Sequence, residues 1–153
     1  MWNSLTQIAP KGVTGLMEDE SVRRILNEVK VASLATVRQT GAPHLTPVSF
    51  VLFDHYLYFT SKENSIKCRN ILGNKRVALS IIGPSEAVLV EGEASIIGPR
   101  EESMSPELTQ TFLEKYARPR RKSEGSVLVR VKPVRILLGK LGRRQKPVKS
   151  ERD

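Results

Sequence analysis

Residues 58–72 read Tyr-Phe-Thr-Ser-Lys-Glu-Asn-Ser-Ile-Lys-Cys-Arg-Asn-Ile-Leu, a strand-like run followed by a short polar loop and a helix-like run. The junction includes the hydroxyls of Thr60, Ser61 and Ser65, and the ammonium group of Lys67 in the first turn of the helix-like run. The first amides of a helix have no partner within the helix, and the helix dipole favours negative charge at that end. Hydroxyl donors and a lysine at such a corner therefore predict a bound phosphate. The alternative from these residues alone is a solvated turn in which Ser65 caps the helix.

Hydrophobic periodicity predicts six strands around this junction, at residues 31–38, 45–53, 56–61, 76–82, 86–97 and 127–138. Helical spacing is found at residues 17–29, 65–72 and 106–116. Asp54 and His55 form a two-residue hairpin candidate, and Gly92 marks a bulge within a long strand. Pro47 cannot donate to a ladder, so its position is an edge or a bulge. Closely spaced strands with a few short helices predict a mainly β fold, a small antiparallel barrel.

The composition is that of one globular domain. The chain has 153 residues, of which 39% are hydrophobic and 27% charged. No apolar run approaches the roughly 20 residues that span a bilayer, and the first residues lack the pattern of a secretory signal. The single cysteine, Cys68, excludes an internal disulfide and fits a reducing compartment, so we expect a cytoplasmic protein. Cys68 lies at helical spacing from Ile71 and is interpreted as a small core residue.

The net charge of +9 is concentrated in two places. Residues 140–153 hold six basic and two acidic residues, a net +4, with no apolar stripe to bury. We therefore expect an irregular arm over 1–15, a barrel domain over 16–139 and a basic, disordered tail over 140–153. A second basic cluster contains Lys115, Arg118, Arg120, Arg121 and Lys122. Such patches can bind nucleic acid, but an aromatic content of 5% offers few stacking platforms, so a small anionic ligand is favoured.

Six short motifs, taken in order, resemble the flavin split-barrel family of pyridoxamine 5'-phosphate oxidase and its small relatives. They are Leu34–Val37, Gly41–Phe50, Leu57–Ser61, Ser65–Ile71, Asn74–Leu79 and Val90–Ala94. The resemblance covers residues 20–138, and it implies a six-stranded antiparallel split β-barrel. It also implies a homodimer with two cofactor sites at the subunit interface.

The resemblance implies where a flavin would bind. The isoalloxazine ring would lie against the strand Thr46-Pro47-Val48-Ser49, and the ribityl phosphate would meet Thr60, Ser61, Ser65 and Lys67. The full set of expected cofactor-binding residues is His44, Thr46, Pro47, Val48, Ser49, Thr60, Ser61, Ser65, Lys67 and Asn70. Arg76 or the cluster at 118–122 is a candidate for completing the phosphate site from the partner subunit.

Departures from the family pattern limit which of the family's activities we expect of this chain. Ile66 stands where the oxidase has an arginine, and neutral Thr46 lies near the place of a second one, for which Lys62 or Arg69 could compensate. No counterpart of the oxidase's substrate-binding segment with tryptophan and arginine follows Leu138. The chain is therefore similar to small relatives that bind FMN or the deazaflavin coenzyme F-420, and it is not expected to oxidise pyridoxamine phosphate.

No side chain is identified as a general acid or base, which fits a protein whose cofactor carries the electrons. The only two histidines, His44 and His55, are too few for a metal site, and none is expected. The favoured function is a flavin-dependent oxidoreductase that moves a hydride to or from a small substrate. A non-catalytic flavin-binding or storage module of the same fold is the alternative, and nucleic-acid binding is a minor one.

Overall fold

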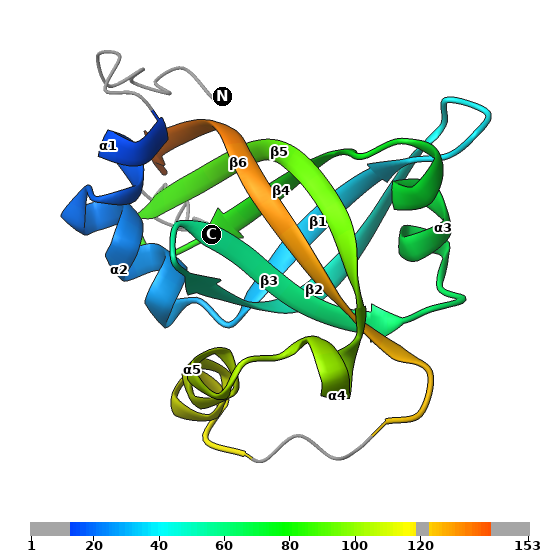
Figure 1. Cartoon of the computed structure of the whole chain (residues 1–153). Coiled ribbons are helices and arrows are strands. Elements are labelled where there is room, and N and C mark those ends of the chain that lie inside the picture. The colour runs from blue at the N-terminus through cyan, green and yellow to red at the C-terminus, as the bar shows by residue number, and fades with distance from the viewer. Residues whose placement is uncertain (1–12, 119–122, 142–153) are drawn as a thin grey trace, which may run out of the picture.

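Six antiparallel strands close into a barrel in the order β1-β2-β3-β6-β5-β4 (Figure 1). The computed structural model describes residues 13–118 and 123–141 of the chain. The strands are β1 Val31–Val37, β2 Pro43–Phe53, β3 Tyr56–Lys62, β4 Arg76–Ile82, β5 Glu86–Pro99 and β6 Ser126–Lys140. The predicted mainly β, six-stranded barrel is confirmed.

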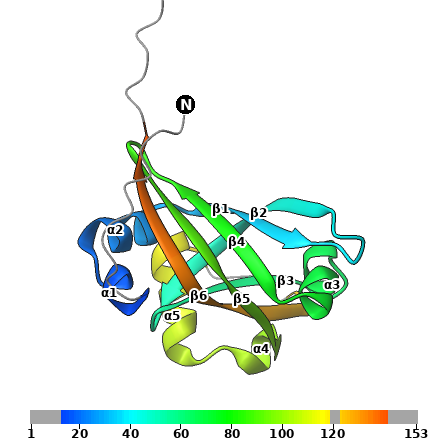
Figure 2. The same ribbon diagram turned by 90° about the horizontal axis from the view of Figure 1, so that it is seen from above.

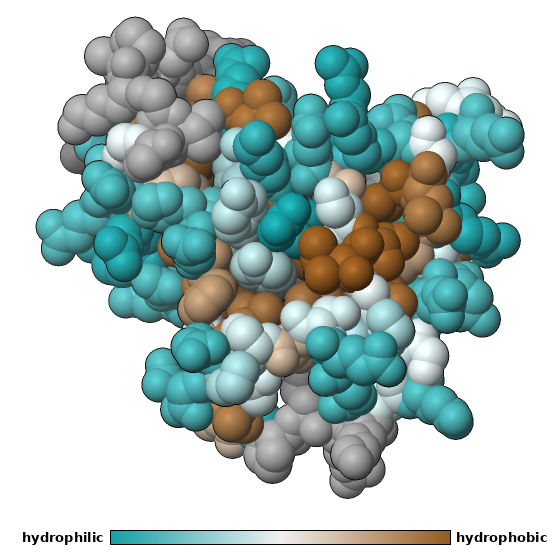
Figure 3. Space-filling view, viewed as in Figure 1, coloured by the Kyte–Doolittle hydropathy of each residue, from teal (hydrophilic) through white to brown (hydrophobic). Residues whose placement is uncertain are grey.

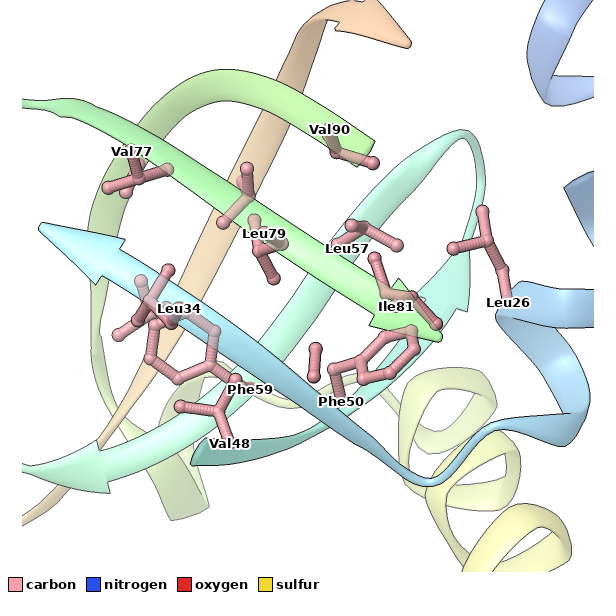
Figure 4. Close-up of a cluster of buried hydrophobic side chains, with 14 of the residues drawn as sticks. Leu26, Leu34, Val48, Phe50, Leu57, Phe59, Val77, Leu79, Ile81 and Val90 are labelled. Carbon is pink, nitrogen blue, oxygen red and sulfur yellow. The ribbon is translucent and has the colours of Figure 1, made fainter. Parts of the chain in front are cut away.

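The interior of the barrel is filled by alternate side chains of these strands, because successive residues of a strand point to opposite faces. Leu34, Phe50, Phe59 and Leu79 are each at most 1% exposed, and Figure 4 shows their side chains pointing into the same cluster. Burying a side chain of this size contributes about 1.5–3 kcal/mol. Cys68 belongs to this core, as predicted.

Two local irregularities of the sheet were predicted from the sequence and are confirmed. Asp54 and His55 have φ of 48° and 64° and form the two-residue turn between β2 and β3. The β5–β6 register shifts between Glu91 and Gly92. A Cβ atom on Gly92 would lie 2.5 Å from the carbonyl oxygen of Lys132, so the close approach of β6 requires glycine there.

The N-terminal helical segment differs from the prediction. The structure has two helices, α1 Val13–Met17 and α2 Glu20–Glu28, instead of one helix over 17–29. Asp19 ends the continuity because its Oδ1 accepts hydrogen bonds from the backbone N–H groups of Ser21 and Val22, which makes it the N-cap of α2. α1 begins inside the range expected to be irregular, and residues 1–12 lie outside the described part.

Three further helices follow the strands: α3 Ile66–Gly73, α4 Arg100–Ser103 and α5 Pro106–Tyr116. Ser105 caps α5 as expected, accepting a hydrogen bond from the Leu108 amide, whereas the four-residue α4 was not predicted. Leu108 and Phe112 of α5 pack against Val51 and Leu128 on the outside of the barrel. Figure 2 shows α3 at one end of the barrel and α1 and α2 at the other.

The last strand runs past the expected domain boundary. β6 continues to Lys140, and the Leu141 amide donates to the carbonyl oxygen of Ser85 at 2.9 Å. The disordered tail stays a prediction, since residues 142–153 lie outside the described residues. No helix within 13–118 and 123–141 has the length and apolarity needed to span a bilayer.

Candidate functional site

The barrel is split along one edge of β2. Residues 43–49 pair with β1, whereas β3 joins β2 only from Phe50 onward. Within the described residues, no strand therefore lies along the second edge of 43–49. Pro47 falls in this segment, opposite Ser33 of β1, which agrees with the predicted edge position.

The side chains of this segment alternate between two faces. His44 and Thr46 are half-buried and Val48 is buried, all on the inward side. Leu45, at 69% exposed, and also Pro47 and Ser49 face outward. The stretch predicted to hold the ring, residues 46–49, thus offers side chains to both faces and its backbone to the open edge.

The predicted phosphate corner brings together two of its three hydroxyls. Ser61 Oγ lies 2.9 Å from Ser65 Oγ, and Ser65 Oγ also accepts a hydrogen bond from the Cys68 amide at 3.3 Å. Ser65 is therefore the N-cap of α3, as the alternative reading of this stretch had it, and Ser61 is 8% exposed beside it. Thr60 points to the opposite face of β3, because strand side chains alternate.

The basic residues of the corner are not equivalent. Lys67 is half-buried in the first turn of α3 and forms no hydrogen bond or ion pair with any described residue. Lys62 Nζ donates to Ser123 Oγ at 2.7 Å and to the Glu124 carbonyl at 2.6 Å. Two of the three donors of the Lys62 ammonium group thus hold the segment before β6. That Lys62 compensates for a missing arginine stays a prediction. Arg69 is exposed on α3.

A polar contact joins α3 to β1, and it contains Thr36, a residue that the predicted site did not include. Asn70 Nδ2 donates to Thr36 Oγ1 at 2.9 Å, and Thr36, at 1% exposed, is the β1 partner of His44. Nδ1 of His44 is buried and has no hydrogen-bond partner among the described residues. Thr36 occupies an inward position of β1 after Ala32 and Leu34. A hydroxyl at a core position is therefore the sequence feature that could have identified Thr36 as a site residue.

Thr36 also lines a cavity of about 510 Å³ at this end of the barrel. Ala35, Pro43 and Val134 form apolar parts of its wall, and Arg76 and Glu91 are among its charged residues. Arg76, predicted to act from a partner subunit, thus lies at a cavity of its own chain. Figure 3 shows apolar side chains gathered on the surface between β5 and α3.

Among the described residues, two ionisable groups have clearly shifted pKa values, and both lie in elements on the α5 side of the barrel. Burial raises the pKa of Tyr58, which packs with the α5 cluster. Burial and the nearby Lys30 lower the pKa of Lys115 to about 8. Lys115 Nζ lies 3.8 Å from the centroid of the Phe50 ring and donates to the Leu26 carbonyl at 2.9 Å.

Sequence comparison identifies one family. Residues 18–138 match the family model described as pyridoxamine 5'-phosphate oxidase. A search of curated proteins finds no match.

Solved structures share the fold at low sequence identity. An F420 reductase has 25% identity and a TM-score of 0.62, with 74% of this chain and 94% of that chain covered. An FAD-binding protein from Mesorhizobium loti has 18% identity and a TM-score of 0.59, with 78% and 92% covered. The heme storage protein HutZ from Vibrio cholerae has 18% identity and a TM-score of 0.63, with 80% and 94% covered.

Proposed function

Because the chain belongs to the pyridoxamine 5'-phosphate oxidase family, we propose that it is an oxidoreductase that uses FMN or coenzyme F-420. The observation that carries the proposal is the open edge of β2 at residues 43–49. Thr36 and Asn70 link this edge to α3, whose N-terminus is the predicted phosphate corner. An extended backbone edge suits a planar heterocycle with donors and acceptors, and the start of α3 suits its phosphate.

The residues of the site fit such a cofactor. Ser65 and Lys67 at the start of α3 would hold the phosphate, with Ser61 supporting Ser65 through their 2.9 Å contact. The orphaned Nδ1 of His44 is a polar atom that a ligand group could satisfy. When bound, the flavin or deazaflavin supplies hydride transfer, while this chain orients the ring and excludes water from one face. Thr60 lies on the other face of β3, so we do not include it among the phosphate-binding residues of this proposal.

The partner in this proposal is a second copy of the chain. Large apolar side chains are exposed on three neighbouring strands, at Val31 of β1, Leu45 of β2 and Ile82 of β4. Val134 of β6 is also exposed. A hollow of about 180 Å³ on the same outer surface, lined by Ser33, Leu45 and Leu137, would accept a side chain of the second copy. Monomeric proteins rarely leave such surfaces uncovered. Light scattering at micromolar protein should give twice the chain mass, and a monomer would contradict the dimer.

The residues at the start of α3 bear on the choice of substrate. Ile66 stands at the helix-start position where the resemblance places an arginine of the oxidase, and two donors of Lys62 are held by Ser123 and Glu124. We therefore propose a small substrate other than pyridoxamine phosphate, and a cytoplasmic location in keeping with the unpaired, buried Cys68.

A binding or storage module is the second candidate function. Among the described residues, the shifted pKa values belong to Tyr58 and Lys115 on the α5 side, so neither marks an acid or base at the proposed site, and such a site is compatible with binding alone as well as with catalysis by the cofactor. Turnover separates the two functions. The protein loaded with reduced FMN or reduced F-420 is mixed with an artificial electron acceptor, and reoxidation is followed in the visible range. An enzyme accelerates reoxidation over the free cofactor, whereas a storage module slows it.

A further inference from the structure

A separate cavity of about 200 Å³ lies between α4 and α5. Figures 1 and 2 both show these two helices side by side. The cavity shares no lining residue with the cavity at the flavin site. Met104, Phe112 and Leu113 supply its apolar wall, and Arg100, Glu101 and Arg118 supply its charges.

Arg100 is an unusual residue for its position, because its side chain is only 8% exposed. Buried arginines are rare unless they are paired. Both Nε, at 3.1 Å, and Nη2 of Arg100 donate to a single carboxylate oxygen, Oε1 of Glu101. The Glu101 side chain is itself 56% exposed. A buried cation is thus paired with a carboxylate that lies largely in water.

An external carboxylate could replace that of Glu101. A guanidinium group presents a planar fork that matches a carboxylate, and Glu101 can leave the fork at little cost because water solvates it. Arg118 is exposed and lines the same cavity, so among the described lining residues there are two guanidinium groups and one carboxylate. The cavity therefore keeps a net positive charge that favours an anion.

The apolar wall selects among anions. Phe112 is 2% exposed, and Met104 and Leu113 are only partly exposed, so much of the lining cannot hydrogen-bond a ligand. Inorganic phosphate needs donors on all sides and would be poorly solvated against this wall. A cavity of about 150 Å³ is known to hold benzene. The space here is thus sufficient for one ring or a short acyl chain that carries a carboxylate.

We propose that this cavity binds a small monocarboxylate with an apolar body, and that Glu101 occupies the Arg100 fork when the ligand is absent. The ligand's carboxylate replaces that of Glu101 on Arg100 and is also attracted by Arg118. Its apolar body packs against Phe112, which ties α5 to Val51 and Leu128 of the barrel. The proposal does not depend on the flavin site.

Benzoate is the probe for this site, with neutral benzamide as its control. Binding is measured from backbone amide NMR shifts of the full chain and from the rise in unfolding temperature. We expect benzoate to shift amides of residues 100–118 and to raise the unfolding temperature, and benzamide to do neither at the same concentration. Glu101→Gln should bind benzoate several-fold more tightly, because a weaker competitor then occupies the fork. Arg118→Gln should weaken binding by about fivefold, as expected for an exposed charge.

A matched variant shows whether the gain in benzoate affinity of Glu101→Gln arises in the cavity or from the change in net charge. Glu107→Gln removes the same charge from the first turn of α5 but lies outside the cavity lining. Its benzoate affinity should equal that of the unmodified protein. The proposal is overturned if benzoate shifts no amides in 100–118, if benzamide binds equally well, or if Glu101→Gln gains no more than Glu107→Gln. Glu101 and Glu107 are both exposed, and the amide oxygen introduced by Glu101→Gln can still accept a hydrogen bond from Arg100, so neither variant is expected to prevent folding.

Discussion

Replacing Lys67 by alanine separates the role of the α3 corner in binding from its role in folding. Lys67 forms no hydrogen bond or ion pair with a described residue, and it lies in the first turn of α3, where the helix dipole disfavours a positive charge. Its removal should therefore leave the free energy of unfolding of the cofactor-free protein within about 0.5 kcal/mol, or raise it slightly. A change in cofactor affinity in this variant can therefore be measured without a change in fold.

The loss in binding can be calculated from the contact that the lysine would make. A hydrogen bond between an ammonium group and a phosphate contributes about 1.5–3 kcal/mol. The dissociation constant should rise by about tenfold to 150-fold, since about 1.4 kcal/mol corresponds to tenfold. Fluorescence titration of the cofactor-free protein with FMN and with F-420 measures this change, and urea denaturation measures stability.

The control variant removes the same charge at the other end of the barrel. Lys140→Ala alters the exposed end of β6, opposite Glu86. It should change neither the dissociation constant of the cofactor nor the free energy of unfolding. An unchanged dissociation constant for both cofactors in Lys67→Ala, or an equal change in Lys140→Ala, would refute the placement of the phosphate. A loss of more than about 1 kcal/mol in the cofactor-free protein would show that Lys67 is structural.

Three further predictions concern Ser65, Gly92 and Lys115. Ser65→Asp keeps an N-cap for α3 but adds a negative charge, so stability should stay within about 1 kcal/mol while FMN affinity falls; retained affinity in a titration would contradict the site. Gly92→Ala should cost about 1–3 kcal/mol in urea denaturation, because its Cβ would lie 2.5 Å from a β6 carbonyl oxygen. Gly73→Ala, with open space around it, should cost far less, and equal losses would argue against the close approach of β6. The pKa of Lys115 is about 8 in the folded protein against 10.5 ordinarily, so the unfolded chain binds more protons between these values. The unfolding free energy of the unmodified protein should therefore rise from pH 8 to 10.5 relative to Lys115→Met, and a relative fall would show that the lysine is stabilised as an ammonium.

The parts of the fold predicted correctly are those set by neighbouring residues. The turn at Asp54 and His55 and the cap at Ser105 each depend on a few consecutive residues. The break at Asp19 was missed because the apolar spacing continues on both sides of it. α4 was missed because four residues are too few to show a helical period.

The candidate site was predicted less completely, because its contacts join distant segments. Lys62 is held by Ser123, 61 positions along the chain, and Asn70 meets Thr36, 34 positions away. No local pattern encodes either pairing. The opposite orientation of Thr60 and Ser61, in contrast, follows from strand alternation and was available from the sequence.

Flavin binding is tested most directly by the visible absorption spectrum of the native protein, followed by mass spectrometry of the ligand released on denaturation. We expect flavin or deazaflavin absorption and a released mass equal to that of FMN or an F-420 species, at one cofactor per chain. In the Lys67→Ala protein the same cofactor should be recovered at lower occupancy. A protein that is colourless as isolated, and stays so after incubation with both cofactors and gel filtration, would contradict the claim.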